Sequence, residues 1–237
     1  MNSNLNDVLA AKMTAWEIDL FGVADLTVCP ADLDYEYGNI WKLYSRAISL
    51  AIYFPASVVA QLRDGPSYTY LAYYDIINAS INAVTLKLAN FLTKLGFAAL
   101  PVPASQRVSP DKLAGIFSHR WAARLCGLGW IGKSGNLINP QVGPYLRLGT
   151  VLTDAPLVPG QPIASRCGDC QVCQKHCPAQ AIKGTIWQEG QALSERLDAG
   201  ACNTYLTEMR QTFGKRICGR CIAFCPFGTK VVLNVEF

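Results

Sequence analysis

The cysteines are the residues of this chain with the most distinctive chemistry. Ten occur in 237 residues, and eight of these follow residue 166. Four of them, from Cys167 to Cys177, have the spacing Cys-x2-Cys-x2-Cys-x3-Cys and are followed by Pro178. In bacterial ferredoxins this spacing lets three thiolates hold one [4Fe–4S] cluster while the fourth binds a second cluster. The run therefore predicts two clusters in the C-terminal part of the chain.

A second run supplies the remaining ligands. The pattern Cys218-x2-Cys221-x3-Cys225 again ends before a proline, and Cys202 stands upstream of it. The crossover rule of two-cluster ferredoxins divides the eight cysteines into two sets. Cluster one takes Cys167, Cys170, Cys173 and Cys225, and cluster two takes Cys177, Cys202, Cys218 and Cys221.

Two structural zinc sites of four cysteines each are the alternative. Structural zinc ligands usually come as two close pairs far apart in sequence, whereas here three cysteines fall within seven residues and both runs end in Cys-Pro. The pattern favours clusters over zinc. Cys29 and Cys126 stand alone, and we expect them to be small buried hydrophobic residues.

The stretch GLGWIGKS at 127–134 matches two nucleotide-binding patterns, the phosphate-binding P-loop and the Gly-x-Gly-x-x-Gly fingerprint. A P-loop needs a strand before it and a helix that begins at Lys133-Ser134. Helix-forming residues precede Gly127, and Gly135 and Pro140 follow. We therefore expect no binding of ATP or GTP. The glycines instead let the backbone approach a large flat ligand or pack under another element.

The rest of the chain alternates helical and strand-like patterns, which indicates an α+β or mixed α/β fold. Helices are predicted at 4–21, 77–95 and 117–126, and strands at 47–54, 97–102 and 145–153. The segment 155–165 contains three prolines and a glycine and is read as a linker. Two domains are therefore predicted, residues 1–160 and 161–237.

Composition excludes several classes of protein. A hydrophobic content of 51% predicts a globular chain with one substantial core. The apolar run 47–54 is far shorter than the roughly 20 residues that cross a bilayer, and the polar start MNSNLNDV lacks the features of a signal peptide. We expect a cytoplasmic protein with no membrane partner. A net charge of +4 favours an ordinary solvated surface over nucleic-acid binding.

Several stretches together resemble the epoxyqueuosine reductase family. They are AARLCGLGWIGKSGNLINPQVGPYLRLGTVLTDAPL, CGDCQVCQKHCPAQAI, CNTYLTE and CGRCIAFCPFG, and the resemblance covers about residues 97–230. Members of that family reduce the epoxide of a modified tRNA base, use cobalamin and two [4Fe–4S] clusters, and are distantly related to reductive dehalogenases. The resemblance implies a nitroreductase-like corrinoid-binding domain followed by a ferredoxin-like two-cluster module.

The resemblance also implies a corrinoid site around the glycine-rich loop. We expect this site to use Ser105, Gln106, His119, Gly129, Trp130, Gly132, Lys133, Ser134 and Asn136. His119 is the candidate proton donor, because its side chain titrates near neutrality. A hydrogen-bonded or exposed histidine without a catalytic role is the alternative for His119, and a lysine in water is the alternative for Lys133.

Two departures from the family pattern bear on the substrate. The tRNA-acting members carry an acidic residue just after the strand that here reads LPVPASQ, whereas the first carboxylate in this chain is Asp111. The chain also ends nine residues after Cys-Pro-Phe-Gly, where those members continue into a helical-repeat domain that helps to bind tRNA. We therefore expect an unidentified small-molecule substrate and an unlikely role for tRNA.

The function predicted is that of an oxidoreductase, a cobalamin-dependent iron–sulfur reductase. Two clusters in series would pass electrons from a soluble low-potential donor, of the ferredoxin or flavodoxin type, to a corrinoid and then to the substrate. The alternatives are a non-catalytic electron-transfer protein, a partner that reduces the corrinoid of another protein, and an epoxyqueuosine reductase acting on tRNA.

Overall fold

The computed structural model describes residues 4–28, 39–108 and 113–233. It divides the chain into two compact units that interleave in sequence. Unit 1 consists of Met1–Ile52, Ile77–Leu128 and Arg147–Ile163, and unit 2 of Tyr53–Ile76, Gly129–Leu146 and Ala164–Phe237. The boundary expected near residue 160 lies close to the last change of unit. The segments 53–76 and 129–146 also group with the cysteine-rich region.

Unit 1 is built on a four-stranded sheet with the order β1-β2-β6-β3. The strands are β1 (Leu20–Asp25), β2 (Arg46–Tyr53), β3 (Ala99–Val102) and β6 (Leu146–Thr153). β1 pairs antiparallel with β2, and β3 pairs antiparallel with β6. Five consecutive residues of β2, from Ala47 to Ala51, are buried. This is expected of an interior strand covered on both faces, and it explains the continuous apolar run in the sequence.

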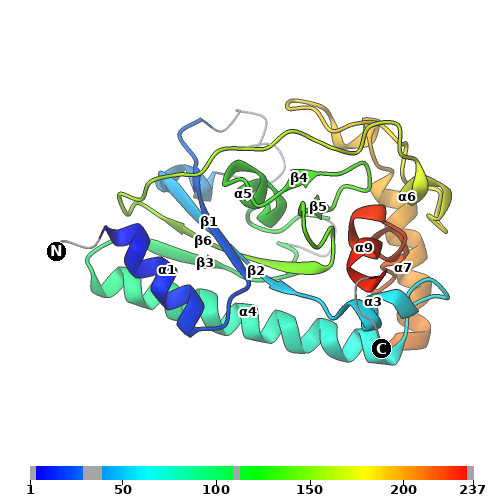
Figure 1. The fold of residues 1–237 in the computed structure, drawn as a ribbon, viewed down its shortest axis with the longest axis horizontal. Coiled ribbons are helices and arrows are strands. Elements are labelled where there is room, and N and C mark those ends of the chain that lie inside the picture. The colour runs from blue at the N-terminus through cyan, green and yellow to red at the C-terminus, as the bar shows by residue number, and fades with distance from the viewer. Residues whose placement is uncertain (1–3, 29–38, 109–112, 234–237) are drawn as a thin grey trace. The chain divides into compact units, whose positions relative to one another are not determined.

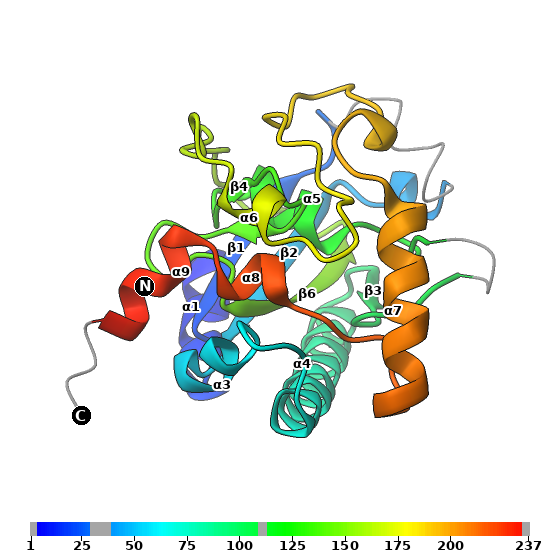
Figure 2. The same ribbon diagram turned by 90° about the vertical axis from the view of Figure 1, so that its right-hand side faces the viewer.

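Helices cover both faces of this sheet, as Figures 1 and 2 show: α1 (Leu5–Ala15) and α4 (Tyr68–Lys94) on one face, and α5 (His119–Leu125) on the other. A close approach of α4 to β6 requires a glycine, because a Cβ at Gly149 would lie 2.6 Å from Cγ2 of Ile81. The helix and strand periodicities predicted for these segments are confirmed, and so is the mixed α/β class.

The N-terminal helix is shorter than predicted. It ends at Ala15 instead of continuing to residue 21, and Glu17 adopts a φ of 55° in the left-handed region. The chain turns there and enters β1, which the sequence reading missed. The apolar residues of the β1 segment also fit a helical period, so periodicity alone does not place this helix end.

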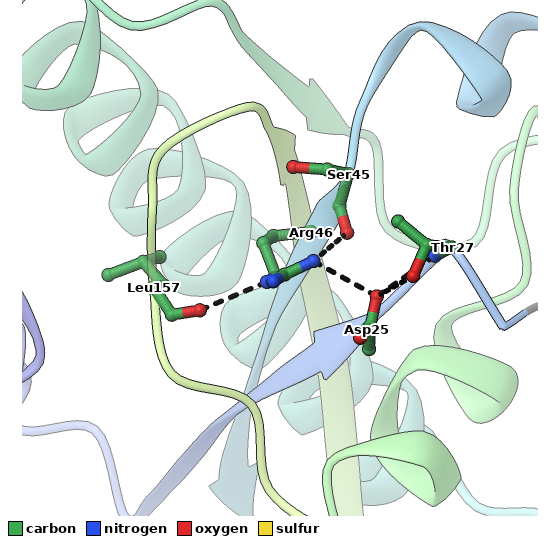
Figure 3. A network of polar contacts seen from close by, with 5 residues as sticks. All are labelled: Asp25, Thr27, Ser45, Arg46 and Leu157. Carbon is green, nitrogen blue, oxygen red and sulfur yellow. Dashed lines mark hydrogen bonds and ion pairs between the residues drawn. The ribbon is translucent and has the colours of Figure 1, made fainter.

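The proline-rich segment after β6, which the sequence predicts to be a linker, is hydrogen-bonded to other parts of unit 1. Asn6 exchanges two side-chain hydrogen bonds of 3.0 Å with the backbone of Val158. Arg46 donates from Nε to the carbonyl of Leu157 and from Nη1 to Asp25, both at 2.9 Å (Figure 3). Hydrogen bonds from Thr27, together with the Arg46 charge, lower the pKa of Asp25. Arg46 therefore joins β2 to β1 through an ion pair and to this segment through a hydrogen bond.

Unit 2 carries a small hairpin and a set of helices. The hairpin pairs β4 (Trp130–Ile131) with β5 (Leu137–Ile138). The helices of unit 2 are α3 (Ala56–Gln61), α6 (Val172–Lys175), α7 (Ala199–Phe213), α8 (Arg220–Ala223) and α9 (Pro226–Leu233). Unit 2 also has a 3-10 turn, η2 (Leu193–Glu195), and unit 1 has another, η1 (Ile40–Leu43). α3 packs on α8 and α9, and α6 packs on α8. Within the described residues, no helix is both long enough and apolar enough to cross a membrane.

Candidate iron–sulfur site

Four cysteines line one pocket in unit 2. Cys167, Cys170 and Cys173 come from the first run, and Cys225 comes from the residue that precedes α9. Ile138, Pro226 and Phe227 form apolar walls of the same pocket. These four cysteines are the set that the sequence assigns to cluster one, and the pocket gathers them from positions up to 58 residues apart in the numbering of the chain.

The remaining four cysteines form a second group. The charges of Cys177 and Cys218 both act on Cys202, and Cys177 also acts on Cys218. Burial raises the pKa of Cys221 to about 12, with Cys218, Cys202 and Cys173 of the first group adding to the rise. Groups influence each other in this way only at short range, so Cys177, Cys202, Cys218 and Cys221 lie near one another.

Burial raises the pKa of several of these thiols, which makes them poor acids in the absence of a cation. It raises the pKa of Cys173 and of Cys225 to about 11, and the neighbouring thiol Cys167 adds to both shifts. A bound metal centre reverses this preference, because its positive charge stabilises the thiolate. The two groups of thiols therefore suit metal clusters. No three His, Cys, Asp or Glu side chains in the described ranges converge tightly enough to hold a single metal ion.

Glycines shape the two cysteine runs. Gly168 follows Cys167 with a φ of 45°, and Gly219 follows Cys218 with a φ of 84°. This left-handed conformation suits glycine, and it turns the chain so that the next cysteine faces the same centre. The backbone N–H of Cys170 then donates to the carbonyl of Cys167 at 3.0 Å. Each Cys-Gly-x-Cys turn leads into a short helix, α6 or α8.

The glycine-rich loop has neither flank that a phosphate loop needs. Helix α5 precedes it and strand β5 follows it. A Cβ at Gly129 would lie 2.3 Å from the carbonyl oxygen of Ile138, and one at Gly132 would lie 2.6 Å from Cγ1 of the same residue. These glycines are therefore required for packing within the β4–β5 hairpin, one of the two roles considered from the sequence.

The polar side chains of this loop point to the cysteine runs. Trp130 donates its indole N–H to Sγ of Cys167 at 3.4 Å, and Lys133 donates from Nζ to the carbonyl of Cys170 at 3.0 Å. Asn136 donates from Nδ2 to Sγ of Cys221 at 3.4 Å and to Oγ of Ser134 at 3.2 Å. Trp130, Lys133 and Asn136 were expected to contact a corrinoid, and the structure gives their polar groups other partners. Lys133 is buried, which differs from a lysine in water.

The other expected corrinoid contacts, Ser105, Gln106 and His119, belong to unit 1. Ser105 and Gln106 are exposed in the turn after β3. Ser105 has a φ of 60°, unusual for serine, and its hydroxyl accepts a hydrogen bond from Arg147. Arg147 also donates from Nε to Oδ1 of Asn78 at 3.1 Å. Arg147 is a polar residue of this region that sequence reasoning missed.

His119 does not have the properties of a proton donor. Its Nε2 donates to the carbonyl of Pro103 at 3.3 Å, and its Nδ1 accepts from Oγ1 of Thr150 at 2.8 Å. The pKa of His119 is lowered to about 4, mainly by removal from water and also by the positive charges of Arg147 and Arg120, against the effect of the Pro103 carbonyl. The ring is therefore neutral at pH 7, and its one N–H is already donated. This geometry fits the alternative of a hydrogen-bonded histidine.

The structure also places Cys126 and the second histidine, His176. Cys126 is buried, and its Sγ lies 3.3 Å from the carbonyl of Ala123. It is a small core residue, as predicted. His176 stacks on Phe224 with ring centroids 3.7 Å apart. Cys29 and Asp111 lie outside the described residues.

Sequence reasoning also missed a tight contact that supports the first group of cysteines. A Cβ at Gly143 would lie 2.3 Å from the backbone nitrogen of Gly228, and one at Gly228 would lie 2.4 Å from the ring of Tyr145. Tyr145 donates its hydroxyl to the carbonyl of Ala223 at 3.3 Å. The signal in the sequence is the pair of motifs Gly-Pro-Tyr and Pro-Phe-Gly, which have glycines where two backbones meet.

Residues 166–228 match a protein family described as a 4Fe-4S double cluster binding domain. This match supports clusters over the zinc alternative and agrees with the double cysteine pattern. The matched segment, residues 166–228, includes all eight cysteines of the two groups.

Curated relatives extend the similarity beyond that domain. The chain is 32% identical over 160 residues to the epoxyqueuosine reductase of Escherichia coli (strain K12), covering 63% of this chain and 40% of that protein. It is 36% identical over 122 residues to the epoxyqueuosine reductase of Bacillus anthracis, covering 47% and 30%. The matches thus span 30 to 40% of the length of these relatives.

Solved structures share the fold. A crystal structure of an epoxyqueuosine reductase with an epoxyqueuosine-modified tRNA-Tyr stem loop has a TM-score of 0.61 and 22% identity, covering 95% of this chain and 65% of that chain. A reductive dehalogenase structure, described as suggesting a mechanism for B12-dependent dehalogenation, has a TM-score of 0.65 and 22% identity, covering 88% and 29%.

The expectation that tRNA is an unlikely partner is wrong. The curated relatives are epoxyqueuosine reductases, and a matching structure of such an enzyme holds a modified tRNA stem loop. The expectation depended on a missing carboxylate after Pro103 and on the end of the chain. Affinity for RNA comes largely from phosphate contacts and stacking, so a missing acid does not argue against RNA binding.

Proposed function

We propose that this chain, a relative of the epoxyqueuosine reductases that carries a double [4Fe–4S] cluster binding domain, is an iron–sulfur reductase that acts on epoxyqueuosine in tRNA. The observation that carries the proposal is the grouping of eight cysteines into two sets in unit 2. Sequence identity of 32 to 36% to epoxyqueuosine reductases supports the substrate.

The ligand sets proposed are those of the ferredoxin crossover. Cluster one is held by Cys167, Cys170, Cys173 and Cys225, and cluster two by Cys177, Cys202, Cys218 and Cys221. The apolar pocket walls support the cluster-one set, because they exclude water from the cluster sulfurs. Cys177 joins the two sets in sequence, since it follows the cluster-one run and binds cluster two.

The reaction needs two electrons. Reduction of an epoxide to an alkene breaks two C–O bonds, forms one C=C bond, and releases the oxygen as water after it takes up two protons. Each [4Fe–4S] cluster transfers one electron at a time, so two clusters supply the pair. We propose that a low-potential electron donor of the ferredoxin or flavodoxin type reduces the clusters again.

We also propose cobalamin as a bound cofactor. The support is the likeness of fold to the reductive dehalogenase described in terms of B12-dependent chemistry. When bound, a corrinoid supplies low-valent cobalt, a reductant that side chains cannot provide. Trp130 would not give it a polar contact, because the single indole N–H is bonded to Cys167. Equilibrium binding of cobalamin, followed by the corrinoid absorption spectrum, tests this step by itself.

The function is tested with anaerobically reconstituted protein, reduced viologen, cobalamin and an epoxyqueuosine-containing tRNA. Mass spectrometry of the nucleosides should show queuosine. Cys173→Ser should lower the conversion rate by at least tenfold, whereas Cys126→Ser, which changes a buried cysteine of unit 1, should retain it. Absence of conversion by fully loaded protein that still reduces an artificial acceptor would favour the electron-transfer alternative.

A further inference from the structure

One short hairpin of unit 2 contacts both groups of cysteines. At its start, the Trp130 indole N–H donates to Sγ of Cys167, a proposed ligand of cluster one. Six residues later, the side chain of Asn136 donates to Sγ of Cys221, a proposed ligand of cluster two. Each group thus receives one side-chain N–H from the segment 130–136.

We propose that Trp130 and Asn136 set the reduction potentials of the two clusters separately, each through one N–H···S hydrogen bond to a ligand sulfur. Such a bond withdraws electron density from a thiolate. It therefore stabilises the reduced cluster, which carries one more negative charge, relative to the oxidised cluster. Hydrogen bonds to the ligand sulfurs are among the factors that set the potentials of iron–sulfur proteins.

The Trp130 indole is held in place on several sides. It is 2% exposed, and Phe227 meets it edge to face with ring centroids 4.9 Å apart. Arg166 lies over the ring at 6.0 Å from its centroid. An indole has a single N–H donor, so fixing the ring plane fixes the direction of that bond. The β4 strand thereby directs one donor to cluster one.

Asn136 is held by its own loop. The hydroxyl of Ser134 accepts from the Asn136 backbone at 3.4 Å and from its Nδ2 at 3.2 Å. The amide carries two N–H groups, so one can bind Ser134 while the other binds Cys221. Gly135 has a left-handed φ of 76°, and Asn136 follows it directly before β5. The turn therefore aims this amide at cluster two.

The proposal is tested by redox titration of the reconstituted protein, monitored by EPR, without tRNA or corrinoid. Trp130→Phe keeps the ring and removes the donor, so the midpoint potential of cluster one alone should fall. Asn136→Ala should lower the potential of cluster two alone. A tenfold loss in the reduction equilibrium corresponds to about 59 mV for one electron. The signals of the two clusters are assigned with Cys170→Ser and Cys218→Ser.

Matched controls remove the same groups from unit 1. Trp16→Phe changes an indole that packs on Lys12 and Lys87, and Asn82→Ala changes an amide that accepts from Ala104. Both should leave the two potentials unchanged. If Trp130→Phe or Asn136→Ala shifts neither potential, or shifts both together, the proposal is overturned.

A measurement on the unmutated protein covers the case in which Trp130→Phe fails to load iron. Protein labelled with 15N in its tryptophan indoles should show 15N hyperfine coupling to reduced cluster one in pulsed EPR. Absence of that coupling in fully loaded protein would overturn the Trp130 assignment. Neither experiment depends on turnover, so failure here is distinct from failure of the proposed function.

Discussion

The indole N–H of Trp130 lies 3.4 Å from Sγ of Cys167, a residue 37 positions later in the chain. Trp130 lies within a stretch that matches the phosphate-loop pattern but lacks the preceding strand and following helix of such a loop. The glycines at 129 and 132 let the β4–β5 hairpin close on itself, and Lys133 is bonded to the carbonyl of Cys170. The motif is thus a by-product of packing a hairpin against a cysteine run.

The first prediction concerns metal content. Reconstituted protein should contain about eight iron atoms and about eight sulfides per chain, as two [4Fe–4S] clusters require. Cys173→Ser should remove about half of the iron, because that residue lines the cluster-one pocket. Cys126→Ser should change nothing. Analysis of iron and acid-labile sulfide measures this content. Stoichiometric zinc, or a content of only four iron atoms per chain, would contradict the assignment of two clusters.

The second prediction concerns the hairpin. Gly129→Ala should lower the free energy of unfolding by roughly 1–3 kcal/mol, because its Cβ would press on the Ile138 carbonyl and force the strands apart. Iron content should fall with it, since the hairpin carries Trp130 and Asn136. Chemical denaturation under anaerobic conditions gives the measurement. Gly200→Ala in α7, where the nearest atom to a Cβ would be Oδ1 of Asp198 at 3.3 Å, is the control and should cause a much smaller loss.

Much of this architecture can be predicted from the sequence, and the exceptions have physical causes. Cysteine spacing is set by cluster geometry, so two ligand sets can be proposed from the sequence, and one pocket gathers the four cysteines of the first set. The long apolar run of β2 and the periodicity of α4 likewise predict buried elements. Short-range patterns do not reveal that the segment 129–146 groups with the cysteine runs, because that depends on contacts between distant residues. The hydrogen bonds of His119 to Pro103 and Thr150 could not be predicted for the same reason.

The third prediction concerns the titration of His119. Its pKa of about 4 is below the ordinary value of 6.5, so the unfolded chain binds more protons between those two pH values. The contribution of His119 to stability is therefore complete above pH 6.5 and is lost as the pH falls toward 4. NMR of histidine-labelled protein should show constant His119 ring signals from pH 8 to about 5.5. A titration midpoint of the His119 ring signals near pH 6.5 would contradict the assignment of a neutral ring with a lowered pKa.

The fourth prediction concerns Lys133. Equilibrium binding with ATP and magnesium should show no saturable site near micromolar affinity. Lys133→Met should leave the carbonyl of Cys170 without this donor, at a cost of about 1–3 kcal/mol in the free energy of unfolding. The exposed Lys183, changed to Met, is the matched control and should have little effect. A nucleotide site that is abolished by Lys133→Met would restore the phosphate-loop interpretation.

A single-turnover experiment tests the central claim most directly. Protein reduced at both clusters, freed of excess reductant and loaded with cobalamin, is mixed anaerobically with an epoxyqueuosine-containing tRNA stem loop. The account predicts up to one queuosine per chain and loss of the EPR signals of both reduced clusters at the same rate. Persistence of both signals with the epoxide intact, in protein that contains its full complement of iron, would contradict it.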